Sequence, residues 1–284
     1  MPSMYIVFDI GATKMRIASS ENAKDLLVSK IVPTPEKFDD AMLVFKNTLR
    51  ELTGGEEIEA VAGGVAGPLD KERATILNPS NLKGWHGAPI KSELERICKA
   101  DVFIENDTAI VGLGEAVAGA GQGEKIVAYV TVSTGVNGVK IVDGQIAPSA
   151  MGFEIGKQII NFDGERFCPA CDEPGYLESY ISGSNIERKY GKKPFEVADP
   201  VLWEETSKLL AVGLNNVTVF WSPEIIVLGG AMILGNPAIP IERIEFHLDQ
   251  LLKIFPEHPK LGKAALGDIG GLYGGLSFLR QNIG

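Results

Sequence analysis

The 284-residue sequence has few cysteines and no long hydrophobic run. Three cysteines, Cys98, Cys168 and Cys171, are too few and odd in number for the disulfide framework of a secreted protein. No window approaches the roughly 18 uninterrupted apolar residues of a membrane span, and the N-terminus lacks a signal-peptide pattern. We therefore expect a cytoplasmic protein with reduced thiols and no membrane partner.

The chain also lacks an excess of basic side chains. Its formal net charge is -10, and the only dense basic stretch covers residues 188–193. This balance argues against a nucleic-acid partner, because the phosphate backbone binds to positive surfaces. With 284 residues, of which 45% are hydrophobic, the chain is long enough for two packed domains.

Residues 5–19 place Asp9 and a turn of small residues between two apolar, strand-like runs. Gly11 leaves this turn open to a positive φ, and Thr13 adds a hydroxyl at the tip. Converging donors beside a carboxylate are typical of a site for phosphate and magnesium, although a purely structural hairpin has the same pattern. Residues 128–142 repeat the arrangement, with Ser133, Thr134 and Gly135 in the turn.

Strand-like and helix-like patterns alternate through the first half. Strands are predicted at residues 27–32, 58–65 and 102–104, with helices at residues 38–52, 90–100 and 109–118. In the second half we predict a helix at residues 201–220, a strand at residues 224–231 and a final, tightly packed helix at residues 271–279. Such alternation predicts an α/β fold with parallel strands covered by helices.

Asp107 lies where a predicted strand passes into a predicted helix. Open α/β sheets bind ligands at this edge, which favours a catalytic carboxylate there. The same position suits an N-cap, so the structural alternative stays open. Gly229 and Gly230 end the strand before the last helices, and such a turn lets the backbone approach a flat ligand closely.

Eight short motifs follow one another along the chain. They are DIGATK at residues 9–14, GVAGP at 64–68, NPSNLKGW at 78–85, END at 105–107, STGVNG at 133–138, GFEIG at 152–156, LE with SG at 177–183, and VLGG at 227–230. Together they resemble the ROK family of sugar kinases, within the actin-like ATPase superfamily, over nearly the whole chain. The resemblance implies two ribonuclease-H-like α/β domains around a central cleft, residues 1–118 joined by a C-terminal helix at about 268–284, and residues 119–267.

The resemblance also implies a role for each matching position. Asp107 corresponds to the base that accepts the sugar hydroxyl proton, and Asp9 would hold Mg²⁺ directly or through water. The implied ATP-binding positions are Asp9, Gly11, Ala12, Thr13, Lys14, Ser133, Thr134, Gly135, Gly229 and Gly230. The implied sugar-binding positions are Asn81, Asn106, Asp107, Glu154, Lys157 and Glu178. The structural alternatives are a solvated Lys14, a loop Asn81, an exposed Glu154 and a helix-starting Glu178.

One region departs from the family pattern. Many members have a histidine and three cysteines that together bind zinc. Here Lys157 takes the histidine position, Cys171 and Tyr176 take the second and third cysteine positions, and Cys168 lies one residue before the first. Two candidate thiolates do not complete a four-ligand structural site, so zinc is not expected. That histidine also contacts the sugar in glucose-type kinases, and Lys157 could pair with Glu154 or Glu178 instead, which leaves the sugar open.

The resemblance implies ATP-dependent phosphorylation of a hexose at its 6-hydroxyl, as in glucokinases. A kinase for N-acetylmannosamine or fructose and a non-catalytic sugar-binding ROK protein remain alternatives. The family's sugar-responsive transcription regulators carry an N-terminal DNA-binding domain, for which no room is expected before residue 5. Relatives are usually homodimers, so a homodimer is expected.

Overall fold

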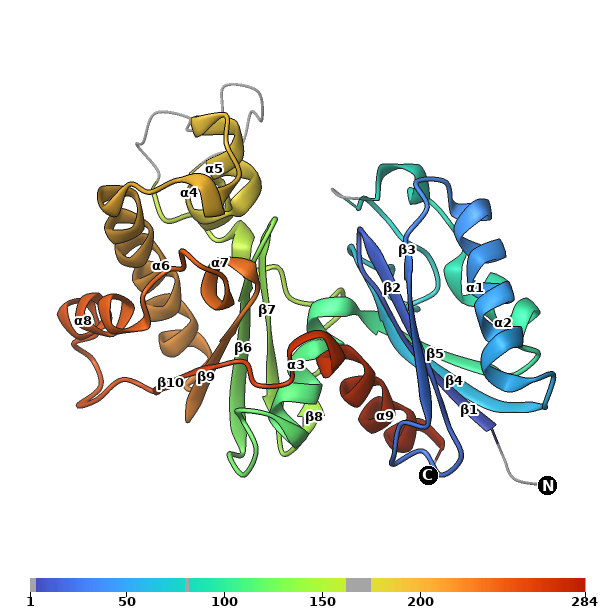
Figure 1. Ribbon diagram of the computed structural model, residues 1–284. Helices are drawn as coiled ribbons and strands as arrows, with labels where there is room; N and C mark the ends of the chain where they lie inside the picture. The colour runs from blue at the N-terminus through green and yellow to red at the C-terminus, as the bar shows by residue number, and fades with distance from the viewer. Residues whose placement is uncertain (1–3, 80–81, 162–174, 284) are drawn as a thin grey trace. The chain divides into compact units, whose positions relative to one another are not determined.

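The computed structural model describes residues 4–79, 82–161 and 175–283. The chain divides into two compact units, drawn in Figure 1. The first unit comprises Met1–Gly119, Gly144–Gly152 and Leu266–Gly284, and the second comprises Ala120–Asp143 and Phe153–Ala265.

The first unit contains a five-stranded sheet with the order β3-β2-β1-β4-β5. Its strands are β1 (Met4–Ile10), β2 (Lys14–Ser20), β3 (Val28–Pro33), β4 (Ile58–Val65) and β5 (Asp101–Asn106). The first three strands pair antiparallel, whereas β1, β4 and β5 run parallel. The carboxyl ends of β1, β4 and β5 therefore meet at one edge.

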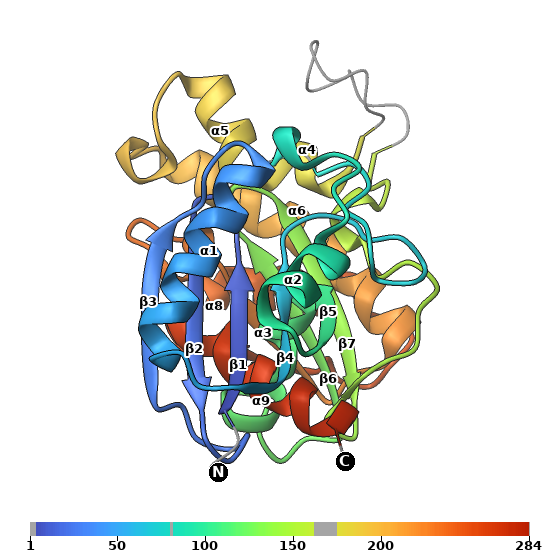
Figure 2. The same ribbon diagram turned by 90° about the vertical axis from the view of Figure 1, so that its right-hand side faces the viewer.

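Helices cover both faces of this sheet, which explains why β1 is apolar at nearly every position. Successive side chains of a strand point to opposite faces. Phe8 packs against Phe45 of α1 (Phe38–Thr53) in one hydrophobic cluster, which also includes residues of α2 (Ile90–Cys98). Its neighbour Val7 packs with residues of α9 (Gly270–Ile283) in another. Figure 2 shows α1 and α2 in front of the strands.

The other sheet has the order β10-β9-β6-β7-β8. Four of its strands belong to the second unit: β6 (Ile126–Val132), β7 (Val136–Val142), β9 (Ile225–Gly229) and β10 (Lys260–Lys263). The short edge strand β8 (Gln145–Ile146) lies in the segment Gly144–Gly152, which is assigned to the first unit. β6 and β7 form an antiparallel hairpin, and β6, β9 and β10 run parallel. Both sheets therefore place a hairpin beside two parallel strands, which confirms the predicted α/β fold with two ribonuclease-H-like sheets.

The longest helices of the second unit are α6 (Pro200–Trp221) and α8 (Ile241–Leu251), which pack against each other and share a core cluster with β6 and β9. Its shorter helices are α4 (Leu177–Ile181), α5 (Gly183–Tyr190) and α7 (Ala231–Leu234). Short 3₁₀ segments lie at Lys83–Trp85, Ile155–Lys157, Pro194–Glu196 and Gly267–Ile269. The predicted long helices and strands all occur, with ends shifted by a few residues.

The composition also predicted that no segment spans a membrane and that the thiols are reduced. Within the described ranges, no helix combines the length and the apolar composition that a membrane span requires. Cys98 is a free, buried cysteine, and burial raises the pKa of its thiol to about 12. It is therefore an unreactive core residue. Cys168 and Cys171 lie outside the described residues.

Helix α3 (Asp107–Ala118) crosses α9 at a contact that only glycine permits. A Cβ on Gly274 would lie 1.8 Å from the backbone oxygen of Ile110, and a Cβ on Gly114 would lie 2.2 Å from the backbone oxygen of Gly270. The close approach confirms the tight packing predicted for the last helix. It also fixes the start of α3 relative to β1, because α9 packs on that strand.

We expect Gly274→Ala to lower the free energy of unfolding by about 3 kcal/mol, because the backbones of α3 and α9 must separate. Gly270→Ala is the matched control on the same helix, since its Cβ would meet no atom closer than 3.4 Å. It should change stability by less than about 1 kcal/mol. Urea unfolding measures both values, and equal stability of the two variants would contradict the close crossing.

Candidate active site

Asp9 lies near the carboxyl end of β1, in a row of residues that crosses the first sheet. Strand pairing places it opposite Arg16 on β2 and opposite Gly64 on β4, and Gly64 in turn pairs with Glu105 on β5. Asp9 is only 7% exposed. Its Oδ2 lies 3.4 Å from Nη1 of Arg16. The parallel strands thus assemble this row at the edge where α/β sheets bind ligands.

Asp107 is the first residue of α3, directly after β5. A Cβ on Gly64 would lie 2.8 Å from the Cα of Asp107, so the helix starts in space that this glycine leaves free. Gly64 is the strand partner of Asp9. The sheet register and the missing side chain together bring the two predicted carboxylates into one neighbourhood of the first unit.

Both carboxyl groups hold their protons more tightly than usual. Burial, and next the charge of Asp107, raise the pKa of Asp9 to about 7, against the opposing effect of Arg16. Burial also raises the pKa of Asp107, although hydrogen bonds from Thr108 oppose the shift. A carboxylate with a raised pKa is a stronger base, and such groups occur preferentially at functional sites.

The cap of α3 is Asn106 rather than Asp107, so the capping alternative for Asp107 is wrong. Oδ1 of Asn106 accepts a hydrogen bond from the Thr108 amide at 3.0 Å, and Nδ2 donates to the Gly67 carbonyl at 3.1 Å. Oδ1 of Asp107 also accepts from the Thr108 amide, at 2.7 Å. Its Oδ2 accepts no hydrogen bond from the described residues. This oxygen is therefore available to take a proton.

The turn between β1 and β2 does not use the positive φ that Gly11 permits. Gly11 lies outside the left-handed region, and a Cβ there would meet only the Lys14 carbonyl, at 3.5 Å. The turn is closed by the Gly11 amide, which donates to Lys14 O at 3.0 Å. Thr13 and Lys14 are exposed. Among the described residues, nothing accepts a hydrogen bond from the amides of Ala12 or Thr13, so the tip offers two free donors.

The turn between β6 and β7 in the second unit has the same property. The Gly183 amide donates to Ser133 O at 2.7 Å, and Ser184 Oγ donates to Thr134 O at 2.7 Å. These contacts hold the turn through its carbonyls. The amides of Thr134 and Gly135 find no acceptor in the part of the chain that the structure describes. Two amide pairs of this kind suit phosphate oxygens.

Glu178 lies in the first turn of α4, as its structural alternative assumed. Its Oε2 accepts a hydrogen bond from the Val136 amide at 2.8 Å, and its Oε1 lies 2.8 Å from Nζ of Lys157. Of the two predicted partners of Lys157, the structure thus shows a contact with Glu178. Glu154 is exposed, which is its structural alternative.

Gly229 and Gly230 allow a close approach within the protein itself. A Cβ on Gly229 would lie 2.4 Å from the Tyr129 hydroxyl, and one on Gly230 would lie 2.3 Å from the Val132 carbonyl. Gly230 also has a φ of 87°. Contacts with β6 therefore leave no room for a side chain at either position. Asn81, a predicted sugar-binding residue, lies outside the described residues.

The sequence analysis missed three residues of the first unit at this edge, Arg16, Arg73 and Asp268, and gave Glu105 of the END motif no role of its own. Nη2 of Arg16 lies 2.5 Å from Oδ1 of Asp268, so one arginine contacts two carboxylates. The hairpin pattern could have indicated Arg16 as the strand partner of Asp9. No local pattern indicates Arg73 or Asp268.

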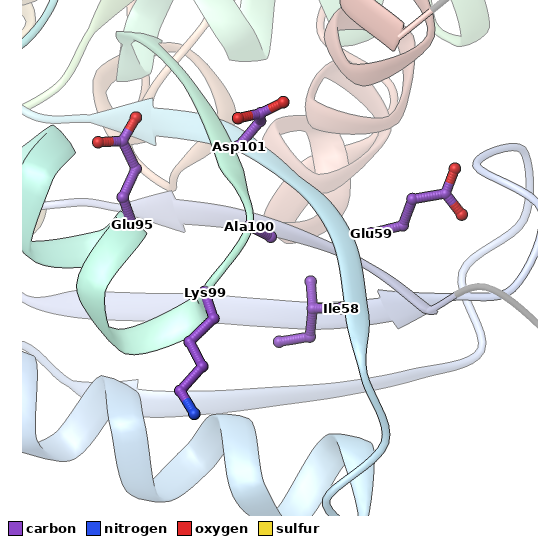
Figure 3. Close-up of a pocket in the computed structure, with 6 residues that line it drawn as sticks. All are labelled: Ile58, Glu59, Glu95, Lys99, Ala100 and Asp101. Atoms are coloured by element: carbon purple, nitrogen blue, oxygen red, sulfur yellow. The ribbon is translucent and has the colours of Figure 1, made fainter.

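A shallow pocket of about 480 Å³ lies elsewhere in the first unit, lined by Ile58, Glu59, Glu95, Lys99, Ala100 and Asp101 (Figure 3). These residues lie at the first residues of β4 and β5 and the end of α2. Asp9 and Asn106 lie near the opposite ends of their parallel strands. The pocket therefore includes none of the candidate residues.

The described residues contain no group of three or more His, Cys, Asp or Glu side chains placed to hold a metal ion. Magnesium in kinases does not need such a group, because one or two carboxylates and the substrate phosphates supply its oxygen ligands. The buried carboxylate of Asp9 fits this role. Burial raises the pKa of Asp9 because its negative charge is poorly stabilised there, and a bound cation would supply that stabilisation.

Comparisons with known proteins place the chain in a family. The ROK family model matches residues 5–282. An N-acetyl-D-glucosamine kinase from Vibrio parahaemolyticus is 28% identical over 302 residues, covering 95% of this chain and 98% of the relative. The crystal structure of a ROK hexokinase from Thermus thermophilus superposes with a TM-score of 0.83 at 28% identity, covering 99% of this chain and 100% of that chain.

A ROK family glucokinase from Streptomyces griseus, in complex with glucose and AMPPNP, superposes with a TM-score of 0.79 at 25% identity. The match covers 99% of this chain and 100% of that chain. Family model, sequence relatives and solved structures agree over almost the full length. The chain belongs to the ROK family.

Proposed function

We propose that this protein is a sugar kinase that transfers the γ-phosphoryl group of ATP to the 6-hydroxyl of a hexose. The observation that carries the proposal is the position of Asp107, at the start of α3 beside Asp9, with one carboxylate oxygen that accepts no hydrogen bond from the described residues. The named activities of the relatives support it: N-acetyl-D-glucosamine kinase, hexokinase, and a glucokinase in complex with glucose and AMPPNP.

In this mechanism Asp107 accepts the proton of the attacking hydroxyl through Oδ2, while the Thr108 amide holds Oδ1. Phosphoryl transfer depends mainly on alignment and on stabilisation of charge, so one well-placed base is sufficient. Asp9 would hold Mg²⁺, directly or through water. When bound, the ion neutralises charge on the phosphate oxygens.

The remaining roles follow the chemistry of each group. The free amides at the two hairpin turns would donate to phosphate oxygens, with Gly11, Lys14 and Ser133 beside them, and Gly229 and Gly230 would face the adenosine. Asn81, Asn106, Glu154, Lys157 and Glu178 would bind sugar hydroxyls, which both donate and accept hydrogen bonds. We assign the two compact units to the two domains of the kinase.

Activity is tested by coupled ADP release with ATP and a panel of glucose, N-acetylglucosamine, N-acetylmannosamine, mannose and fructose. We expect one of these sugars to give a kcat/KM at least about tenfold above the others, because polar sites reject substrates that leave their groups unpaired. Binding of a sugar in calorimetry without ADP release would favour the alternative, a non-catalytic sugar-binding protein. Metal analysis of the same sample tests the expectation that zinc is not a component.

We expect Lys157 to influence which sugar the protein binds. Lys157→Met should raise KM for the best sugar by about tenfold, because Glu178 Oε1 loses its cationic partner and reorients. Stability should change by less than about 1 kcal/mol, since the pair is partly exposed. Lys208→Met, on an exposed position of α6, is the control. Steady-state kinetics on both variants measure the difference, and an unchanged KM would remove Lys157 from the site.

The expected cytoplasmic location and homodimer stay predictions. Light scattering of the purified protein at micromolar concentration measures the mass, and a value near twice the 30.5 kDa of one chain is expected.

A further inference from the structure

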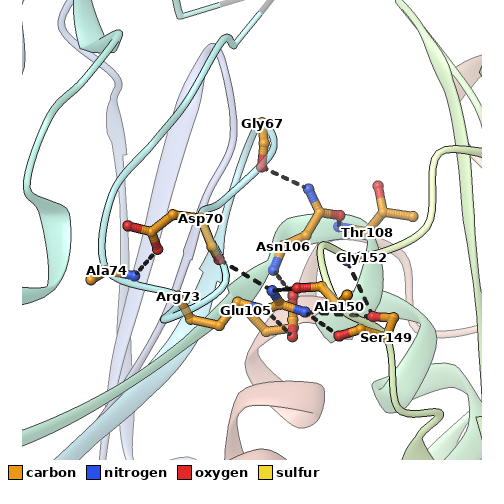
Figure 4. A network of polar contacts seen from close by, with 10 residues as sticks. All are labelled: Gly67, Asp70, Arg73, Ala74, Glu105, Asn106, Thr108, Ser149, Ala150 and Gly152. Carbon is orange, nitrogen blue, oxygen red and sulfur yellow. Dashed lines mark hydrogen bonds and ion pairs between the residues drawn. The ribbon is translucent and has the colours of Figure 1, made fainter.

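Arg73 makes more contacts than any local pattern of the sequence suggests. Figure 4 shows its guanidinium among Glu105, Ser149, Ala150 and the Asp70 backbone. Nε lies 2.9 Å from Oε2 of Glu105, and the two Nη atoms donate to carbonyls of Asp70, Ser149 and Ala150 at 3.2–3.3 Å. One side chain thereby connects three segments of the first unit that are far apart in sequence.

Contacts within the loop that carries Arg73 fix the position of this residue. Oδ1 of Asp70 accepts a hydrogen bond from the Ala74 amide at 2.7 Å, and Leu69 bridges to Ile76 across the loop base. Arg73 itself has a φ of 54°, a left-handed conformation that is costly for a residue with a side chain. Strained residues of this kind persist where the surrounding structure holds them, and they concentrate at functional sites.

Glu105 connects Arg73 to the residues beside the proposed base, Asp107. Its Oε1 accepts a hydrogen bond from the Asn106 amide at 2.8 Å, while its Oε2 is held by Arg73. Asn106 in turn caps α3 through the Thr108 amide, and Asp107 lies between them. The residue before Asp107 is thus tied directly to the carboxylate that Arg73 orients, and the residue after it is held through the side chain of Asn106.

Arg73 also holds the segment Gly144–Gly152, which belongs to the first unit although β7 of the second unit precedes it. Besides the two carbonyl contacts, Ser149 Oγ accepts a hydrogen bond from the Gly152 amide at 3.2 Å. The planar guanidinium can satisfy Glu105 and these carbonyls at once, because it presents five donors in a fixed geometry. A lysine ammonium has only three donors, and they are not held in this planar geometry.

We propose that Arg73 is a positioning residue for phosphoryl transfer: it orients Glu105 and the segment Gly144–Gly152 so that Asp107 is held in line with its substrate. The proposal rests on the proposed kinase function of Asp107. Arg73 touches no reacting atom, so its effect should fall on kcat rather than on the affinity for sugar or nucleotide. A small displacement of a catalytic group is sufficient for a large loss of rate.

The test compares Arg73→Lys with Arg96→Lys. Arg96 is the matched control, because it also pairs with a glutamate, Glu93, but on the exposed surface of α2. Kinetics are measured with the best sugar of the panel, together with the Kd of a non-hydrolysable ATP analogue. We expect Arg73→Lys to lower kcat roughly 10- to 100-fold with KM and Kd within threefold, and Arg96→Lys to leave all three unchanged. Arg73→Ala should regain part of its kcat with added methylguanidinium.

A kcat of Arg73→Lys within twofold of the parent would overturn the proposal, as would a loss that only follows the folded fraction. If the parent phosphorylates no sugar, the proposed function fails, and hydrogen exchange decides the positioning role separately. The Asn106 and Thr108 amides should then exchange at least about tenfold faster in Arg73→Lys than in Arg96→Lys. Equal exchange in the two variants would show that Arg73 does not hold this segment.

Discussion

Asp107→Asn is expected to lower kcat by about 10²- to 10⁴-fold, the usual contribution of a general base. Asparagine keeps the oxygen that accepts the Thr108 amide, so the start of α3 should be unchanged. It loses the ability to take a proton from the sugar hydroxyl. The Kd values for sugar and for a non-hydrolysable ATP analogue should therefore stay within a few-fold of the parent. Steady-state kinetics and calorimetry measure these quantities.

The control for Asp107→Asn is Asp101→Asn, at the first residue of β5, which removes an exposed carboxylate from the opposite end of the same strand. It should leave kcat unchanged. A kcat of Asp107→Asn within a few-fold of the parent would show that another group takes the proton. Loss of sugar binding in this variant would instead assign Asp107 to recognition alone.

Asp9→Asn is expected to have opposite effects on activity and stability. Activity should fall by at least about 10²-fold, because the proposed magnesium ligand is lost. Stability at pH 8 should rise by about 4 kcal/mol, the equivalent of a pKa raised from 3.8 to about 7. This value already includes the opposing effect of Arg16, which keeps Asp268 as a partner in the variant.

The sign of this effect follows from proton binding. Because the pKa of Asp9 is raised in the folded protein, the folded state binds the proton more tightly than the unfolded state between pH 3.8 and about 7. The contribution of Asp9 to stability is thus complete below pH 3.8 and is lost as the pH rises towards 7. Asparagine mimics the protonated form, so the gain should be near zero at pH 4 and full at pH 8.

Urea unfolding of the parent, Asp9→Asn and Asp101→Asn at the two pH values measures this difference. The exposed Asp101 variant should show no comparable dependence on pH. If Asp9→Asn raises the free energy of unfolding equally at both pH values, ionisation of Asp9 does not destabilise the folded protein. The raised energy of the buried carboxylate would then not be the reason for its affinity for a cation.

Local sequence patterns were sufficient to predict the helices and strands and part of the candidate site. The apolar run of β4 predicted its bounds, and the two hairpins and the END motif pointed to the turns and to Asp107. The sequence did not decide the φ of Gly11, because a glycine in a turn permits a positive φ without requiring it. The role of Asp107 was left open between an N-cap and a catalytic base, and the structure shows Asn106 as the N-cap residue.

The sequence by itself determined the fold class, the family and the order of the candidate residues, because hydrophobic periodicity and short motifs act within a few residues. Only the tertiary structure decided that Arg73 meets Glu105, that Arg16 joins Asp9 to Asp268, and that Lys157 contacts Glu178. It also decided the pKa of Asp9, which depends on burial by distant segments. Contacts between groups tens or hundreds of residues apart arise when helices and strands pack, and no local pattern encodes their geometry.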